Sequence, residues 1–252
     1  MKLKIYAIRN KKNIYGYFFV DIENDGCYIE LNPKLGNYPI FFDIFIKKKK
    51  YVIESYWTRK WIEERVIPAE RQNINDILKE NGFKYYNEIL MILASKAHSS
   101  MDDNYLEEIK YEDVSDFVKE RRKHLIKDFI YLKENNKVIV FFENDKSKII
   151  DLKTKNNKPF INSFGSEIIS TSYEFYSYDD IYNNGKESPI LYDDLLTYIK
   201  ENILSTNDIK KEYDYSRQYV NKLKQEKRIY ELHDNLFIYN NIKTYKNKWK
   251  KV

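Results

Sequence analysis

The sequence predicts an α+β fold built from three successive parts. The first fifty residues contain short apolar or alternating runs separated by turn residues, which is typical of antiparallel strands. Helical periodicity then replaces the alternation from residue 57 to about 109, and short β-prone runs return between 127 and 178. The segment 205–239 has the order helix, turn, helix and hairpin. With 42% hydrophobic and 16% aromatic residues, the chain can form a packed core.

The N-terminal strands are expected at 2–8, 14–22 and 27–31, with a fourth at 40–46. The tripeptide Asn-Asp-Gly at 24–26 is a good hairpin turn because these residues adopt left-handed backbone conformations readily. This region is therefore expected to form an antiparallel sheet.

The helical part is expected to contain helices over 71–80 and 87–97 after a first helical stretch around 61–68. Gly82 follows the second helix at the position where a glycine commonly ends a helix. The stretch WIEERVIPAERQNINDILKENG, followed by SSMDDNY, resembles the N-terminal part of HipA-like proteins from Firmicutes. The matching residues are Glu64 to Pro68, Arg71, Leu78, Gly82, Ser100, Asp103, Asn104 and Tyr105.

The HipA-like resemblance covers about fifty residues and does not extend to kinase activity. A kinase needs a phosphate-binding loop, and the six glycines of this chain form neither a GxGxxG nor a GxxxxGK[ST] pattern. The length that remains is also too short for the catalytic lobe. The resemblance implies an accessory module of mobile-element or toxin–antitoxin systems.

A charged helix is expected over 112–126, and a small antiparallel sheet is expected after it. The β-prone runs lie at 129–132, 137–142 and 148–152, and a further β-prone stretch covers 160–178. The predicted division of the chain is an N-terminal α+β domain (1–110), a helical connector (111–126), a β-rich module (127–190) and a C-terminal unit (191–252).

The C-terminal unit predicts a winged helix-turn-helix. Asp208 suits the first turn of one helix, Ser216 can cap the next helix, and Tyr219, Val220 and Leu223 form its apolar stripe. Two β-prone runs at 229–232 and 236–239 flank a turn at 233–235 and would form the wing. The plainer alternative is a helix pair that packs on the rest of the protein or on a protein partner.

The outward side chains of the second helix are of the types that contact base edges and phosphates. They are Ser216, Arg217, Gln218, Asn221, Lys222, Lys224 and Gln225. The run SRQYVNKLKQEKRI resembles the recognition helix of MerR-type and excisionase-type regulators, which implies that this helix, taken as 216–228, faces DNA. In this chain the first helix has Lys or Glu where such regulators often carry a small residue.

Positive charge is concentrated at the same end of the chain. Residues 196–252 contain thirteen Lys and Arg against seven Asp and Glu, a net charge of +6, whereas the whole chain carries +5. Lysines with interspersed Tyr245 and Trp249 form the tail, and four of them are candidate phosphate contacts: Lys243, Lys246, Lys248 and Lys250. The alternative is an ordinary solvated terminus.

The best enzyme candidate in the sequence is a magnesium-dependent nuclease site. Asp151 and Lys153 end one predicted strand and Glu143 ends the strand before it, so a hairpin could bring two carboxylates and a lysine together. The alternative is an ordinary hydrated hairpin. The histidines at 98, 124 and 233 have no metal-ligand spacing, and the single cysteine, Cys27, excludes an internal disulfide. We expect no bound metal and no cofactor.

We therefore expect a DNA-binding regulator or accessory protein of a bacterial mobile element, phage or toxin–antitoxin system, with DNA or RNA as its ligand. The N-terminal domain would serve a protein partner or a homodimer. The alternative is a phage or mobile-element anti-defence protein that acts on a protein partner. The sequence contains neither a convincing signal peptide nor an apolar run of membrane-spanning length, which favours a cytoplasmic protein without membrane contact.

Overall fold

The computed structural model describes residues 3–100, 102–132, 135–154 and 159–193, together with the backbone of three strands at 203–205, 229–233 and 236–239. The fold is α+β with antiparallel sheets, as the sequence predicts. None of the helices in these ranges is both long and apolar enough to cross a membrane.

The N-terminal sheet has the strand order β4-β3-β2-β1-β5. Its members are β1 (Leu3–Arg9), β2 (Ile14–Asp21), β3 (Gly26–Leu31), β4 (Val52–Ile53) and β5 (Tyr105–Ile109). The first three confirm the predicted strands, and Asp25 in the turn between β2 and β3 has a left-handed φ of 52°. The strand β5 lies where helical structure was expected, so that expectation is wrong.

Both faces of this sheet are buried. Along β2, Tyr17 and Phe19 pack into one hydrophobic cluster, whereas Phe18 and Val20 pack into another. This division follows from the alternation of side chains in a strand. Because both faces are covered, β2 has a nearly continuous apolar sequence.

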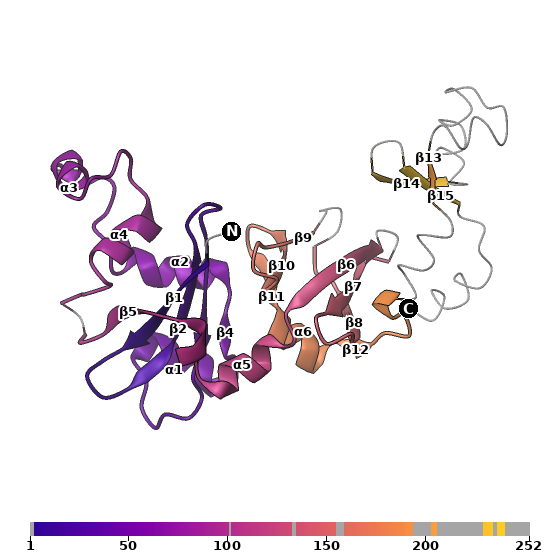
Figure 1. Ribbon diagram of the computed structural model, residues 1–252, viewed down its shortest axis with the longest axis horizontal. Coiled ribbons are helices and arrows are strands. Elements are labelled where there is room, and N and C mark those ends of the chain that lie inside the picture. The colour runs from indigo at the N-terminus through magenta and orange to yellow at the C-terminus, as the bar shows by residue number, and fades with distance from the viewer. Residues whose placement is uncertain are drawn as a thin grey trace.

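One face is covered by helices α1 (Ile40–Lys47), α2 (Ser55–Glu63) and α4 (Glu88–Ala94), while α3 (Ile74–Glu80) lies farther out (Figure 1). The expected strand at 40–46 is wrong, because these residues form α1. Phe42 and Phe45 are three apart and buried together, which fits a helix, and Pro39 stands at the N-cap. A short apolar run has no periodicity strong enough to separate the two conformations.

The predicted charged helix is shorter than expected, a 3₁₀ turn at Tyr111–Asp113 followed by α5 (Asp116–Arg122). Figure 1 shows α5 running from the N-terminal sheet toward the second sheet. That sheet has the order β12-β8-β7-β6. Its strands are β6 (Ile126–Leu132), β7 (Lys137–Phe142), β8 (Ser147–Asp151) and β12 (Lys186–Glu187).

A third sheet follows in the order β11-β10-β9. Its strands are β9 (Phe160–Ile161), β10 (Glu167–Thr171) and β11 (Glu174–Ser177), and α6 (Tyr178–Asn184) continues directly from β11. These elements confirm antiparallel β structure between 127 and 178, but the strands form two sheets where one was expected.

One hydrophobic cluster joins the parts that the sequence separates. It contains Phe19 and Tyr28 of the N-terminal sheet, Val118 of α5, Val140 of β7 and Ile181 of α6. The predicted domain boundaries stay a prediction, but residues on both sides of the predicted connector share this core.

The described C-terminal strands are β13 (Ile203–Ser205), β14 (Ile229–His233) and β15 (Leu236–Tyr239). They are antiparallel in the order β13-β15-β14, with Ile203 opposite Ile238 and Tyr230 also opposite Ile238. The β-prone runs predicted at 229–232 and 236–239 are therefore confirmed as paired antiparallel strands. The predicted helix pair lies within 206–228, outside the described residues.

Candidate functional site

The candidate site is an open cleft of about 690 Å³ between α2 and the β9–β11 sheet. Tyr56 of α2, Phe160 of β9 and Phe175 of β11 line it, and Cys27 and Phe164 also contribute. Its volume lies within the range of small-molecule pockets.

Helix α2 lies between the core and the cleft, and its helical periodicity places different residues on the two faces. Thr58, Trp61 and Ile62 are buried on one face. The cleft residues Tyr56, Arg59, Lys60 and Glu63 are spaced three, four and seven apart, so they share the other face.

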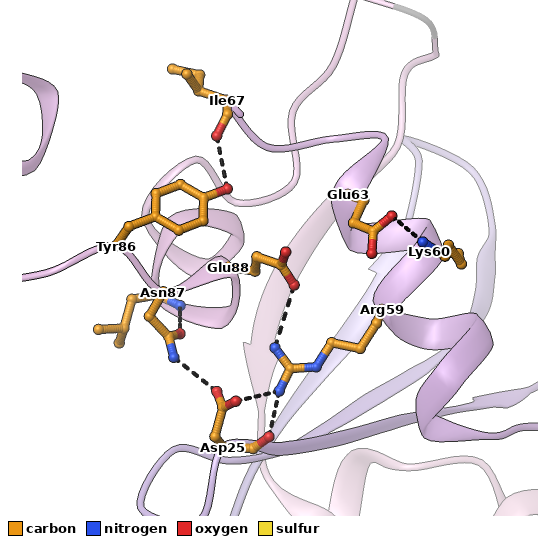
Figure 2. A network of polar contacts seen from close by, with 9 residues as sticks. Asp25, Arg59, Lys60, Glu63, Ile67, Tyr86, Asn87 and Glu88 are labelled. Carbon is orange, nitrogen blue, oxygen red and sulfur yellow. Dashed lines mark hydrogen bonds and ion pairs between the residues drawn. The ribbon is translucent and has the colours of Figure 1, made fainter. Parts of the chain in front are cut away.

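Arg59 holds one rim of the cleft in place (Figure 2). Its Nη2 lies 2.7 Å from Oδ2 of Asp25 and also donates to the Asp25 carbonyl, while its Nη1 lies 3.5 Å from Oε2 of Glu88. Asn87 donates to the other Asp25 oxygen at 2.8 Å. The turn between β2 and β3 is thereby tied to α2 and to the start of α4.

Other polar side chains of the cleft are also engaged within the protein. Lys60 lies 2.6 Å from Glu63, and Asn162 donates to Glu167 at 3.0 Å and to Ser166 at 2.8 Å. The apolar walls are more open, because Phe160 is 55% exposed. The cleft therefore offers exposed aromatic surface beside polar groups that are already paired.

A group of carboxylates meets at the inner end of α2. Glu167 is fully buried, and its Oε2 accepts the backbone N–H of Ser55, the first residue of α2, at 3.1 Å. Burial raises the pKa of Glu167. Glu54, the preceding residue, has a side chain only 6% exposed, and its burial raises its pKa to about 7.

Lys50 lies beside Glu54 and a third carboxylate, Asp180. Lys50 Nζ lies 2.8 Å from Oδ2 of Asp180 in α6 and 4.0 Å from Oε1 of Glu54. Burial is the main cause of the raised pKa of Glu54, Lys50 opposes it, and the charges of Asp180 and Glu167 raise it further. We refer to Glu54, Glu167 and Asp180 as the carboxylate cluster.

A second buried carboxylate has the opposite surroundings. Glu30 of β3 is fully buried between Arg121 and Arg122 of α5, at 2.9 and 3.2 Å. The hydroxyl groups of Tyr178 and Tyr28 donate to it at 2.9 and 3.2 Å. We call these five residues the Glu30 cluster, and it joins β3, α5 and α6.

The predicted nuclease site is not formed. Asp151 pairs with Lys137 at one end of the β7–β8 hairpin, whereas Glu143 follows Phe142 at the other end. At about 3.3 Å per residue, the two carboxylates are roughly 20 Å apart. The backbone N–H of Lys153 donates to Glu174 at 2.6 Å instead.

The histidines of the described part pack against tyrosines. His98 stacks on Tyr105 with centroids 5.7 Å apart, and His124 stacks on Tyr182 at 3.7 Å. Burial lowers the pKa of His124 and raises that of the Cys27 thiol to about 12. The described residues contain no group of three His, Cys, Asp or Glu side chains that could hold a metal ion.

The segment 61–105 is held together near its two ends by Arg65 and Asp102. Arg65 binds both oxygens of Asp102, donates to the carbonyl of Ala97 at 3.2 Å, and lies 4.9 Å from the Trp61 ring. Gly82 has the left-handed φ of 71° expected at the end of a helix.

The eleven predicted nucleic-acid contacts lie in 206–228 and 240–252, outside the described residues. Sequence reasoning missed the cleft and both charge clusters. Glu30 gave the only local signal, a charge within the apolar strand Gly26–Leu31. Comparison with known proteins finds no matching family model, curated protein or solved structure.

Proposed function

We propose that this chain binds DNA through a C-terminal winged helix-turn-helix and serves as a regulator or accessory factor of a mobile element, phage or toxin–antitoxin system. The observation that carries the proposal is the strand order β13-β15-β14. A winged helix needs a strand before its helix pair that pairs with the far strand of the wing. Here Ile203 and Leu204 of β13 pair with Ile238 and Phe237 of β15.

The intervening segment and its charge support the same function. The 206–228 segment between β13 and β14 is long enough for two short helices and a turn, and it contains Arg217, Gln218 and Asn221. The net charge of +6 over residues 196–252 favours a polyanionic ligand.

Fluorescence anisotropy with labelled random duplex DNA tests the proposal. We expect binding at low salt that weakens by at least about tenfold between roughly 50 and 200 mM salt, because phosphate contacts release counterions. Lys11→Ala/Lys12→Ala is the charge control, since both lysines are exposed in the β1–β2 turn. Absence of binding at low salt would contradict the proposal and favour the protein-partner alternative.

Site selection followed by mutation tests the predicted recognition helix. Arg217→Ala and Asn221→Ala should weaken binding to the selected site by about tenfold or more, and binding to random DNA by less. Equal losses on both DNAs would assign these side chains to the phosphate backbone alone.

A further inference from the structure

The carboxylate cluster lies at a junction between segments far apart in the chain. Glu54 precedes α2, Glu167 belongs to β10, and Asp180 belongs to α6. The Ser55 N–H to Glu167 bond and the Lys50 to Asp180 ion pair are the polar links across this junction.

The charge balance at the junction is unfavourable when every carboxyl group is ionised. Lys50 is the cation that faces Glu54, and it is closer to Asp180 than to Glu54. The adjacent Asp179 of α6 interacts instead with Arg121 and accepts a hydrogen bond from Asn183 at 3.0 Å. The buried Glu54 and the partly exposed Asp180 therefore share one ammonium group, the charge of the buried Glu167 adds to that of Asp180, and like charges in a buried site oppose full ionisation.

The junction also forms one end of the cleft. Ser55 and Glu167 both line the cleft, and next to them Tyr56 stacks on Phe175 with centroids 5.7 Å apart. A change in the distance between α2 and β10 would therefore change the width of the cleft.

We propose that the carboxylate cluster is a proton-dependent joint, closed when Glu54 is protonated and loosened, with a wider cleft, when Glu54 ionises. This inference is independent of DNA binding. The pKa of about 7 for Glu54 lies above its ordinary value of 4.5. A raised carboxyl pKa means that the Glu54 contribution to stability is complete below about 4.5 and is lost as the pH rises through about 7.

The test compares urea unfolding of the full chain and its Glu54→Gln variant between about pH 5.5 and 8.5. The ratio of the two unfolding equilibrium constants should change by roughly thirtyfold over this range in favour of the variant, because glutamine does not ionise. Glu63→Gln is the matched control, at the exposed end of the same helix. The control should keep the pH dependence of the parent chain.

Hydrogen exchange reports on the joint itself. After correction for the intrinsic pH dependence, protection of the Ser55 amide should fall with rising pH in the parent chain and stay constant in Glu54→Gln. The same pH dependence in both proteins would overturn the proposal. Should Glu54→Gln fail to fold, Glu167→Gln, which can still accept the Ser55 N–H, is expected to change the pH dependence in the same direction.

Discussion

Two buried glutamates on the same interface have different charged neighbours. Glu30 has two guanidinium groups and two hydroxyl groups within 3.2 Å. Glu54 has one ammonium group at 4.0 Å and is repelled by Asp180 and Glu167. Burial removes water from both carboxyl groups, and it is the main cause that raises the pKa of each to about 7. Arg121 and the Tyr178 hydroxyl oppose this rise at Glu30, whereas at Glu54 Lys50 opposes it and the charges of Asp180 and Glu167 add to it.

The largest expected loss of stability comes from removing the Glu30 carboxylate. Glu30→Ala should lower the free energy of unfolding by about 3–5 kcal/mol, because Arg121 and Arg122 would remain buried without their carboxylate. Chemical denaturation near pH 7 measures this loss. Glu112→Ala, at an exposed position, is the control. A loss below about 1 kcal/mol would show that the two arginines find other partners or water.

A substitution in the turn that precedes Glu167 should have a smaller effect on stability than Glu30→Ala. Gly165 has a φ of +67°, and a Cβ there would lie 2.5 Å from the carbonyl oxygen of Ile126. Gly165→Ala should therefore cost about 2 kcal/mol or more and disturb the position of Glu167. Thermal unfolding compares it with Gly36→Ala, because a Cβ at Gly36 meets nothing within 4 Å. Equal stability of the two variants would argue against a constrained turn.

Substitution of Lys50 should have the smallest effect on stability. The pH dependence of that effect tests whether Lys50 interacts with ionised Glu54. Lys50→Met should lower the free energy of unfolding by no more than about 1 kcal/mol, since the lysine is 40% exposed. The loss should be larger at pH 8.5 than at pH 5.5, because Glu54 is ionised only at the higher pH. Denaturation curves at both pH values measure it. A loss that does not vary with pH would limit the role of Lys50 to its contact with Asp180.

The local patterns of the chain predicted much of its secondary structure. The β-prone run at 137–142 gives β7 at the predicted bounds, and the runs at 229–232 and 236–239 give the paired strands β14 and β15. The run at 40–46 was misassigned, because seven mostly apolar residues fit a buried strand and a buried helix equally well. The nuclease hypothesis failed on register, which places Asp151 opposite Lys137 rather than beside Glu143.

By itself, the sequence determined the α+β class, the positions of several strands and the concentration of positive charge in residues 196–252. These properties depend on near neighbours in the chain or on composition. Only the tertiary structure decided that Glu30 pairs with two arginines some ninety residues away, and that the charges of Glu167 and Asp180 act on Glu54. Interactions between such distant residues depend on how separate sheets and helices pack, and the pattern of any single segment does not encode them.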